Sequence, residues 1–155
     1  MTVGIYSDRL AELGLTLPQV VAPVAAYVPA VISGNLVFTA GQLPFVDGKL
    51  PATGKVDTDV PAEDAKQYAA TSALNALAAI VSVIGDIDRI TRIVKVVGFV
   101  ASETSFTGQP GVINGASELL GQIFGEIGQH ARSAVGVAVL PLDSPVEVEL
   151  IVEFA

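Results

Sequence analysis

The C-terminal part of the chain carries the stretch ARSAVGVAVLPLDSPVEVELIVEF, residues 131–154, and its two halves decide the fold. Small and β-branched residues predict a strand over Arg132–Leu140, and strict alternation of apolar and polar residues predicts another over Val146–Phe154. The segment between them, Pro141–Pro145, has two prolines around an Asp-Ser pair and reads as a turn. We therefore expect antiparallel strand pairing at this end of the chain.

Turn and capping residues divide the rest of the chain into further elements. We expect a short helix over Arg9–Leu13 capped by Ser7, strands over Val28–Ile32 and Leu36–Ala40, a helix over Pro61–Ile84, a strand over Ile90–Val100 and a helix over Pro110–Ile127. The resulting order, β-β-α-β-α-β-β, predicts an α+β fold: a mixed sheet with two helices packed on one face. Because two helices cover only one face, we expect a partner to cover the other.

Composition supports a folded, oligomeric protein. Of its 155 residues, 51% are hydrophobic and only 15% are charged, against about 25% in an average domain. This length favours a single domain over residues 1–155, which here begins with an N-terminal arm, residues 1–21, that contains the short helix. The chain has no cysteine and one histidine, which excludes disulfide scaffolds, thiolate metal sites and cysteine nucleophiles.

Charge argues against several classes of partner. The net charge is −8 and no run of basic residues exists, so we expect no nucleic-acid ligand. The most apolar region, residues 69–84, is interrupted by polar side chains, and we expect no membrane-spanning segment. The first residues do not resemble a signal peptide, so we expect a cytoplasmic protein. No metal-spaced cluster, phosphate-binding loop or nucleophile elbow is present in the sequence.

Arg132 is the most distinctive candidate for ligand binding. From Val96 to the C-terminus it is the only lysine or arginine, among seven acidic residues. A guanidinium beside small residues such as Ala134 has room to hold a ligand carboxylate with two hydrogen bonds. The alternative is an ion pair with Glu147 or Glu149 on the following strand.

The last strand supplies candidate acids. Its alternation places Glu147, Glu149 and Glu153 on one face. In a partly buried site, neighbouring carboxylates raise the pKa of one of them and yield a base for water. The alternative is a solvated strand face.

Three other polar residues have simpler explanations beside a functional one. Tyr27 offers a phenol, but tyrosines usually pack in cores or interfaces with the hydroxyl at the rim. Asn114 lies in the first turns of the second helix, where asparagine is typical of a cap or turn. His130 precedes Arg132 by two residues, so both project the same way in an extended segment, but a lone histidine is more often a surface or structural group.

Three segments together resemble the YjgF/RidA family, also called endoribonuclease L-PSP-like proteins. They are SGNLVFTAGQLP (33–44), ARSAVGVAVLP (131–141) and VEVELI (146–151). An arginine that opens a strand, a Leu-Pro turn and an apolar-Glu-apolar-Glu strand follow one another as in the family signature. The likeness covers about Tyr27–Phe154.

The resemblance implies a chorismate-mutase-like fold and a homotrimer with clefts between subunits. It implies hydrolysis of reactive enamine and imine intermediates, formed from amino acids by pyridoxal-phosphate enzymes, to 2-keto acids and ammonia, with no metal or organic cofactor. By motif position, Arg132 corresponds to the carboxylate-binding arginine and Glu147 to the acid beside the attacking water. The implied substrate-binding positions are Tyr27, Gly41, Asn114 and Ala134.

The chain also departs from the family pattern. Ala40 stands where a serine is frequent, Ala134 where a cysteine is frequent, and His130 where a proline usually precedes the Ala-Arg pair. With the N-terminal arm, these departures indicate a divergent branch. Two alternatives to an imine deaminase stay open: a trimeric module that binds small carboxylates without turnover, and a ribonuclease, which the negative charge disfavours.

Overall fold

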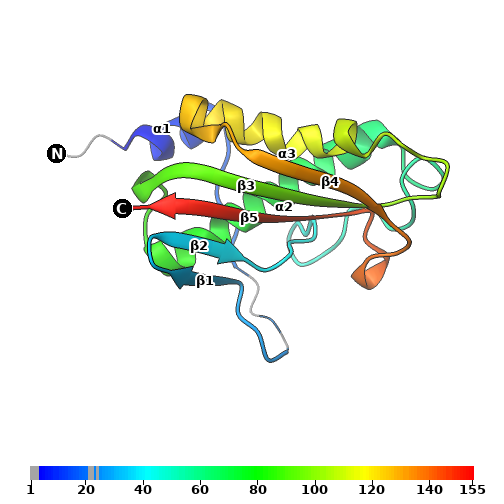
Figure 1. The fold of residues 1–155 in the computed structure, drawn as a ribbon, viewed down its shortest axis with the longest axis horizontal. Helices are drawn as coiled ribbons and strands as arrows, with labels where there is room; N and C mark the ends of the chain where they lie inside the picture. The colour runs from blue at the N-terminus through cyan, green and yellow to red at the C-terminus, as the bar shows by residue number, and fades with distance from the viewer. Residues whose placement is uncertain (1–3, 21–22, 24) are drawn as a thin grey trace.

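In a computed structural model of the chain, which describes residues 4–20, 23 and 25–155, five strands form one sheet with helices packed on it (Figure 1). The helices are α1 (Ile5–Glu12), α2 (Ala62–Ile84) and α3 (Gln109–Phe124), with 3-10 turns η1 (Ile87–Arg89), η2 (Gly125–Gly128) and η3 (Pro141–Asp143). The strands are β1 (Ala30–Ser33), β2 (Leu36–Thr39), β3 (Ile90–Ala101), β4 (Ala131–Val137) and β5 (Val146–Phe154). The expected order of strands and main helices is confirmed, and so is the α+β class.

The strand order corrects the expectation of a C-terminal hairpin. The order is β1-β2-β5-β3-β4, with β5 antiparallel to both β2 and β3 and with β4 parallel to β3. The sheet is mixed, as expected, but β3 separates β4 from β5. After β3 the chain crosses over through α3 and returns parallel to β3 at the edge of the sheet, as a β-α-β connection does. β5 lies in the centre, where its alternate residues are buried.

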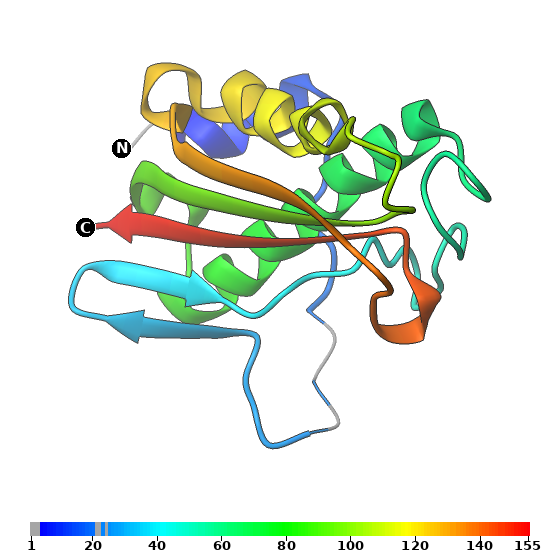
Figure 2. The same ribbon diagram turned by 45° about the vertical axis from the view of Figure 1, so that its right-hand side comes forward.

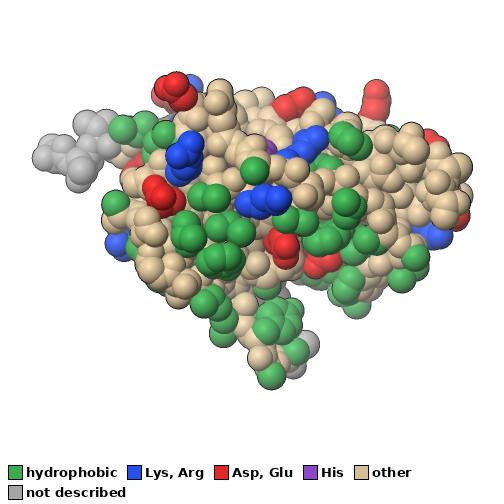
Figure 3. All heavy atoms as spheres, viewed as in Figure 1, with side chains coloured by type: hydrophobic (Ala, Val, Ile, Leu, Met, Phe, Trp, Pro, Cys, Tyr) green, Lys and Arg blue, Asp and Glu red, His purple; other side chains and the backbone are tan. Residues whose placement is uncertain are grey.

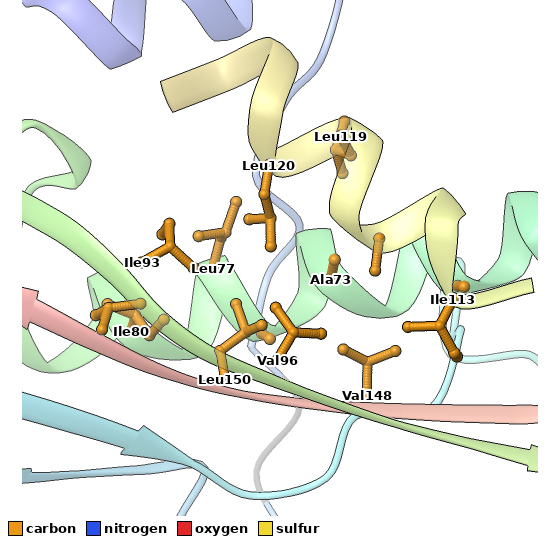
Figure 4. Close-up of a cluster of buried hydrophobic side chains, with 14 of the residues drawn as sticks. Ala73, Leu77, Ile80, Ile93, Val96, Ile113, Leu119, Leu120, Val148 and Leu150 are labelled. Atoms are coloured by element: carbon orange, nitrogen blue, oxygen red, sulfur yellow. The ribbon is translucent and has the colours of Figure 1, made fainter. Parts of the chain in front are cut away.

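Helices α2 and α3 lie on the same face of the sheet, which we call the helix-covered face (Figures 1 and 2). Between helices and sheet lies the hydrophobic core (Figure 4). Its central side chains come from α2 (Ala73, Leu77, Ile80), α3 (Ile113, Leu119, Leu120), β3 (Ile93, Val96) and β5 (Val148, Leu150). At Gly98 an added Cβ would overlap Ile113, so glycine allows α3 to lie close to β3.

The long helix α2 is the buried core helix of the domain. It begins after Pro61, which is the N-cap and not the first helical residue, and it ends at Gly85, whose φ of 91° is left-handed. Its most apolar window has a mean hydropathy of 1.4, so by length and composition alone it could cross a membrane although polar residues interrupt it. However, half of that window is buried against the sheet and α3.

The opposite face of the sheet has no helix among the described residues, and we call it the open face. Its apolar side chains are Val31, Phe38, Val97, Phe99, Val135 and Ile151, and the charged ones beside them include Lys95, Glu147, Glu149 and Glu153. In the space-filling view of this face, hydrophobic side chains gather over the strands with a few charges between them (Figure 3). Exposed fractions of 52% for Val31 and 44% for Val135 are high for a sheet surface without a partner.

The N-terminal helix differs from expectation in its start. α1 begins at Ile5, so Ser7 lies inside it and does not cap it. Instead Ser7 Oγ donates to Asp88 at 2.6 Å, and the Tyr6 and Ser7 amides donate to the same carboxylate, which fixes α1 against η1. Burial alone would raise the pKa of Asp88, but these hydrogen bonds outweigh it and hold the pKa below its usual value. Val21, where the expected arm ends, lies outside the described residues.

Helix α3 and strand β4 end earlier than expected. α3 ends at Phe124, because Gly125 has a φ of 61° and the chain continues as the 3-10 turn η2. β4 ends at Val137, where its pairing with β3 also ends.

Ser72→Ala is expected to stabilise the protein. Ser72 is fully buried in α2, and its hydroxyl has no hydrogen-bond partner among the described residues. Removing an unpaired buried hydroxyl and introducing a better helix former should raise the free energy of unfolding by about 1 kcal/mol. Thermal or urea unfolding measures the change. A destabilised Ser72→Ala would mean that the hydroxyl has a partner in solution.

Candidate functional site

The expected site residues separate into two groups, and their charged members, Arg132 and Glu147, lie on opposite faces of the sheet. Arg132 pairs with Val96, which pairs with Leu150, and this row lies on the helix-covered face. Glu147 pairs with Phe99 in the alternate row, on the open face. Within one copy of the chain, the guanidinium and the carboxylate therefore point away from a common ligand.

The first group, which we call the arginine cluster, consists of Arg132, Asn114, Ser117 and His130, where β4 runs beside α3. Arg132 Nη1 donates to Asn114 Oδ1 at 2.8 Å and to Ser117 Oγ at 3.2 Å. Asn114 and Ser117 are three residues apart on α3, so their side chains share one face of that helix. Asn114 is thus a partner of Arg132, and its interpretation as a cap or turn residue is wrong.

No carboxylate neutralises Arg132 among the described residues. The ion pairs among the described residues are Arg9–Glu12, Lys55–Glu103 and Lys66–Glu118, and none of them includes Arg132. The alternative of an ion pair between Arg132 and Glu147 or Glu149 is wrong, because β3 lies between β4 and β5 and the side chains leave opposite faces. A partly buried guanidinium held only by neutral groups is suited to bind an anion.

The second group, which we call the glutamate cavity, consists of Glu147, Gly41 and Tyr27 with the residues around them. The cavity has a volume of about 730 Å³ and is lined by these three residues and by Pro18, Gln19, Val20, Pro23, Pro29, Gln42, Leu43, Phe45, Asp47, Gly48, Asn75, Ala78, Pro141 and Leu142. That volume is in the range of small-molecule sites. Three positions that the family resemblance implied therefore lie at one cavity.

The surroundings of Glu147 in this cavity alter its pKa. Burial raises the pKa of Glu147, and the negative charge of Glu149 on the same strand face raises it further. Gly41 lies so close that an added Cβ would overlap the Glu147 carboxyl. The glycine therefore leaves room for this carboxyl at the end of β2, where Gln42 pairs with Val148.

Tyr27 and Ala134 lie in different parts of the molecule. Tyr27 precedes β1, lines the cavity and has 57% of its surface exposed, so it is not a core residue. Ala134 lies two residues after Arg132 on the helix-covered face, opposite Gly98 of β3, and packs against the core.

Two contributions were not evident from the sequence. Asn75 of α2 donates to the carbonyl oxygens of Leu43 and Phe45 at 3.0 and 3.1 Å, and so fixes the loop that forms one wall of the cavity. Ser117 joins Arg132 to His130; its position three residues after Asn114 was the signal for it. Over the described ranges, no group of three acidic or histidine side chains could hold a metal ion.

Comparison with known proteins identifies the family. The family model described as "YjgF/chorismate_mutase-like, putative endoribonuclease" matches residues 7–154. Protein TCP17 of Trypanosoma cruzi is 41% identical over 151 residues, which cover 97% of this chain and 94% of that protein. The crystal structure of Atu1372 from Agrobacterium tumefaciens, a protein described as of unknown function, is 46% identical, with a TM-score of 0.90 and coverage of 97% and 93% of the two chains.

Similarity to a member named RidA is lower. RidA from the Antarctic bacterium Psychrobacter sp. PAMC 21119 is 26% identical, with a TM-score of 0.62, and the match covers 88% of this chain and 94% of that one. The chain belongs to the YjgF/chorismate-mutase-like family, and it is more similar to Atu1372 than to this RidA.

Proposed function

We propose that this protein is a cytoplasmic enzyme that hydrolyses reactive 2-imino and 2-enamino acids to 2-keto acids and ammonia without a cofactor. The observation that carries the proposal is the pair of complementary groups: an arginine with no carboxylate partner among the described residues, and a cavity glutamate whose pKa is raised. The first suits the substrate carboxylate and the second suits activation of water.

The active site is formed between subunits. Because Arg132 and Glu147 leave opposite faces of the sheet, a substrate that contacts both requires the arginine cluster of one subunit beside the glutamate cavity of another. The apolar open face supplies the surface on which a second copy packs. A contact between two different surfaces of the chain forms a ring when its rotation closes, and the family resemblance implies a ring of three.

The reaction follows from these positions. Arg132 binds the carboxylate of the imino acid and draws electron density from C2. Water attacks C2 of the protonated imine while Glu147 accepts one of the water protons, so a C–O bond forms, the C=N π pair moves to nitrogen, and a neutral carbinolamine results. Glu147 then returns the proton to the amine. As the C–N bond breaks, a lone pair of the C2 hydroxyl oxygen forms the C=O bond, the hydroxyl proton passes to water, and ammonia leaves the 2-keto acid. Imines hydrolyse readily in water, so holding substrate and water together provides enough acceleration.

The deciding experiment measures the decay of an imino acid. Iminopropionate is generated in situ by an amino-acid oxidase, and its hydrolysis is followed with and without the protein as keto-acid and ammonia release. We expect release faster than the spontaneous rate and proportional to protein concentration. Binding of a 2-keto acid without faster release would instead make the protein a carboxylate-binding module and overturn the enzymatic proposal.

Sedimentation equilibrium at micromolar concentration is expected to give three times the 15.9 kDa mass of one chain. The reason is the apolar open face together with a site that one subunit cannot complete. Phe38→Asp, which places a charge on this face, should shift the equilibrium towards monomer. A parent protein that sediments as a monomer would contradict the intersubunit site.

Binding to single-stranded RNA is expected to be weak and nearly independent of salt. With a net charge of −8, few cations are available to displace counterions from phosphates. Titration at low and moderate salt measures both the affinity and its salt slope. Sub-micromolar binding at moderate salt, with cleavage that Arg132→Ala abolishes, would favour the ribonuclease that the family description names.

A further inference from the structure

The lone histidine of the chain takes part in a directed hydrogen-bond chain that ends at Arg132. His130 Nδ1 lies 2.6 Å from the carbonyl oxygen of Gly128, and its Nε2 lies 2.9 Å from Ser117 Oγ. A carbonyl oxygen only accepts, so Nδ1 carries a proton and donates it to Gly128. In the neutral ring, Nε2 is then an acceptor, and the Ser117 hydroxyl donates to it.

This polarity leaves the Ser117 oxygen free to accept from Arg132. Arg132 Nη1 donates to Ser117 Oγ, Ser117 donates to His130, and His130 donates to the backbone, so every bond points the same way. Bonds aligned in this manner polarise and strengthen one another. The far end is fixed, because Gly128 is buried and a Cβ there would lie 2.7 Å from the Leu120 carbonyl oxygen of α3.

The chain determines which edge of the guanidinium meets a ligand. Both protons of Arg132 Nη1 are used, one by Asn114 and one by Ser117. Among the described residues no hydrogen bond engages Nε or Nη2, and these two groups form the other two-pronged edge of a guanidinium. An anion therefore has one complete edge to bind.

We propose that Ser117 and His130 are positioning residues that hold Arg132 by Nη1, so that its Nε and Nη2 edge receives the substrate carboxylate. The inference rests on the proposed function for the identity of the ligand. Neither residue touches the substrate; each acts through the arginine.

The test measures the affinity of the parent and its variants for a 2-keto acid, the reaction product, by calorimetry or NMR titration of 2-oxobutanoate. Ser117→Ala and His130→Leu should each weaken binding roughly 3- to 10-fold, the equivalent of one hydrogen bond. His130→Gln keeps an acceptor for the Ser117 hydroxyl and should bind within about twofold of the parent. Gln129→Leu, at the exposed neighbouring position, is the matched control and should not change the affinity.

A double variant tests whether His130 acts on Arg132 through Ser117 or independently of it. Ser117→Ala combined with His130→Leu should bind no more weakly than Ser117→Ala alone, since the histidine acts only through the serine. The uncharged 2-oxobutanamide, which lacks the carboxylate, should bind the parent and all variants alike. Melting temperatures confirm that each variant is folded.

The outcomes distinguish this proposal from the proposed function. Additive losses, or a folded His130→Leu with parental affinity, would overturn the positioning role while leaving hydrolysis possible. If iminopropionate is not hydrolysed but the affinities follow the expected order, the deaminase is wrong and the positioning role stands. A parent that binds no 2-keto acid overturns the positioning role, and the hydrolysis of iminopropionate then decides the proposed function separately.

Discussion

Arg132→Lys is expected to lower kcat/KM for an imino acid nearly as much as Arg132→Ala, by roughly tenfold to a few hundredfold. Lysine keeps the positive charge but loses the planar fork that binds a carboxylate with two hydrogen bonds. It also cannot donate to Asn114 and Ser117 while presenting a second edge to a ligand, as Arg132 can. A carboxylate would meet a mobile point charge instead of an oriented pair of donors.

Steady-state hydrolysis of iminopropionate by the parent, Arg132→Lys and Arg132→Ala measures this loss, with melting curves to exclude unfolding. Arg92→Lys is the matched control, because Arg92 is an exposed arginine of β3 opposite Glu153 and belongs to neither site group. If a folded Arg132→Lys retains the parental kcat/KM, Arg132 is only a structural link between β4 and α3.

The sequence predicted the helices and strands better than it predicted which strands pair with each other. Alternation in Val146–Phe154 and the left-handed stop at Gly85 are local signals, and the structure confirms both. The expected pairing of the last two strands is wrong, because strand pairing depends on tertiary contacts and not on local sequence. The crossover through α3 places β4 beside β3 at the edge of the sheet, and β5 pairs with β2 and β3 instead.

The wrong strand pairing also explains why the sequence did not identify the hydrogen-bond partners of Arg132. With β4 and β5 treated as neighbours, an ion pair between Arg132 and Glu147 was a natural alternative, and a single-subunit site was not excluded. With β3 between them, the two residues face opposite ways, and the partners of Arg132 become the α3 side chains Asn114 and Ser117. Ser117 was not singled out from the sequence, since a helical serine has many uses and its spacing from Asn114 was the one signal for it.

Glu147→Gln is expected to lower kcat roughly a hundredfold with a smaller change in KM. The amide keeps the shape of the side chain but cannot accept a proton from water. Gly41→Ala tests the same group without changing it, because the added methyl would overlap the Glu147 carboxyl and displace it. We expect Gly41→Ala to lower kcat as well, although the carboxylate remains in the chain.

The pH dependence of kcat/KM identifies the base, and the Glu149→Gln variant is the control. A base must be ionised, so activity should fall as the pH drops through the pKa of Glu147, which burial and Glu149 raise above the usual 4.5. Glu149→Gln removes one of these two causes while leaving Glu147 in place. It should therefore lower the pKa of Glu147 and move the acid limb of kcat/KM to lower pH, with turnover near the parent's at neutral pH. An acid limb that stays in place in Glu149→Gln, or that persists in Glu147→Gln, would show that another group accepts the proton from water.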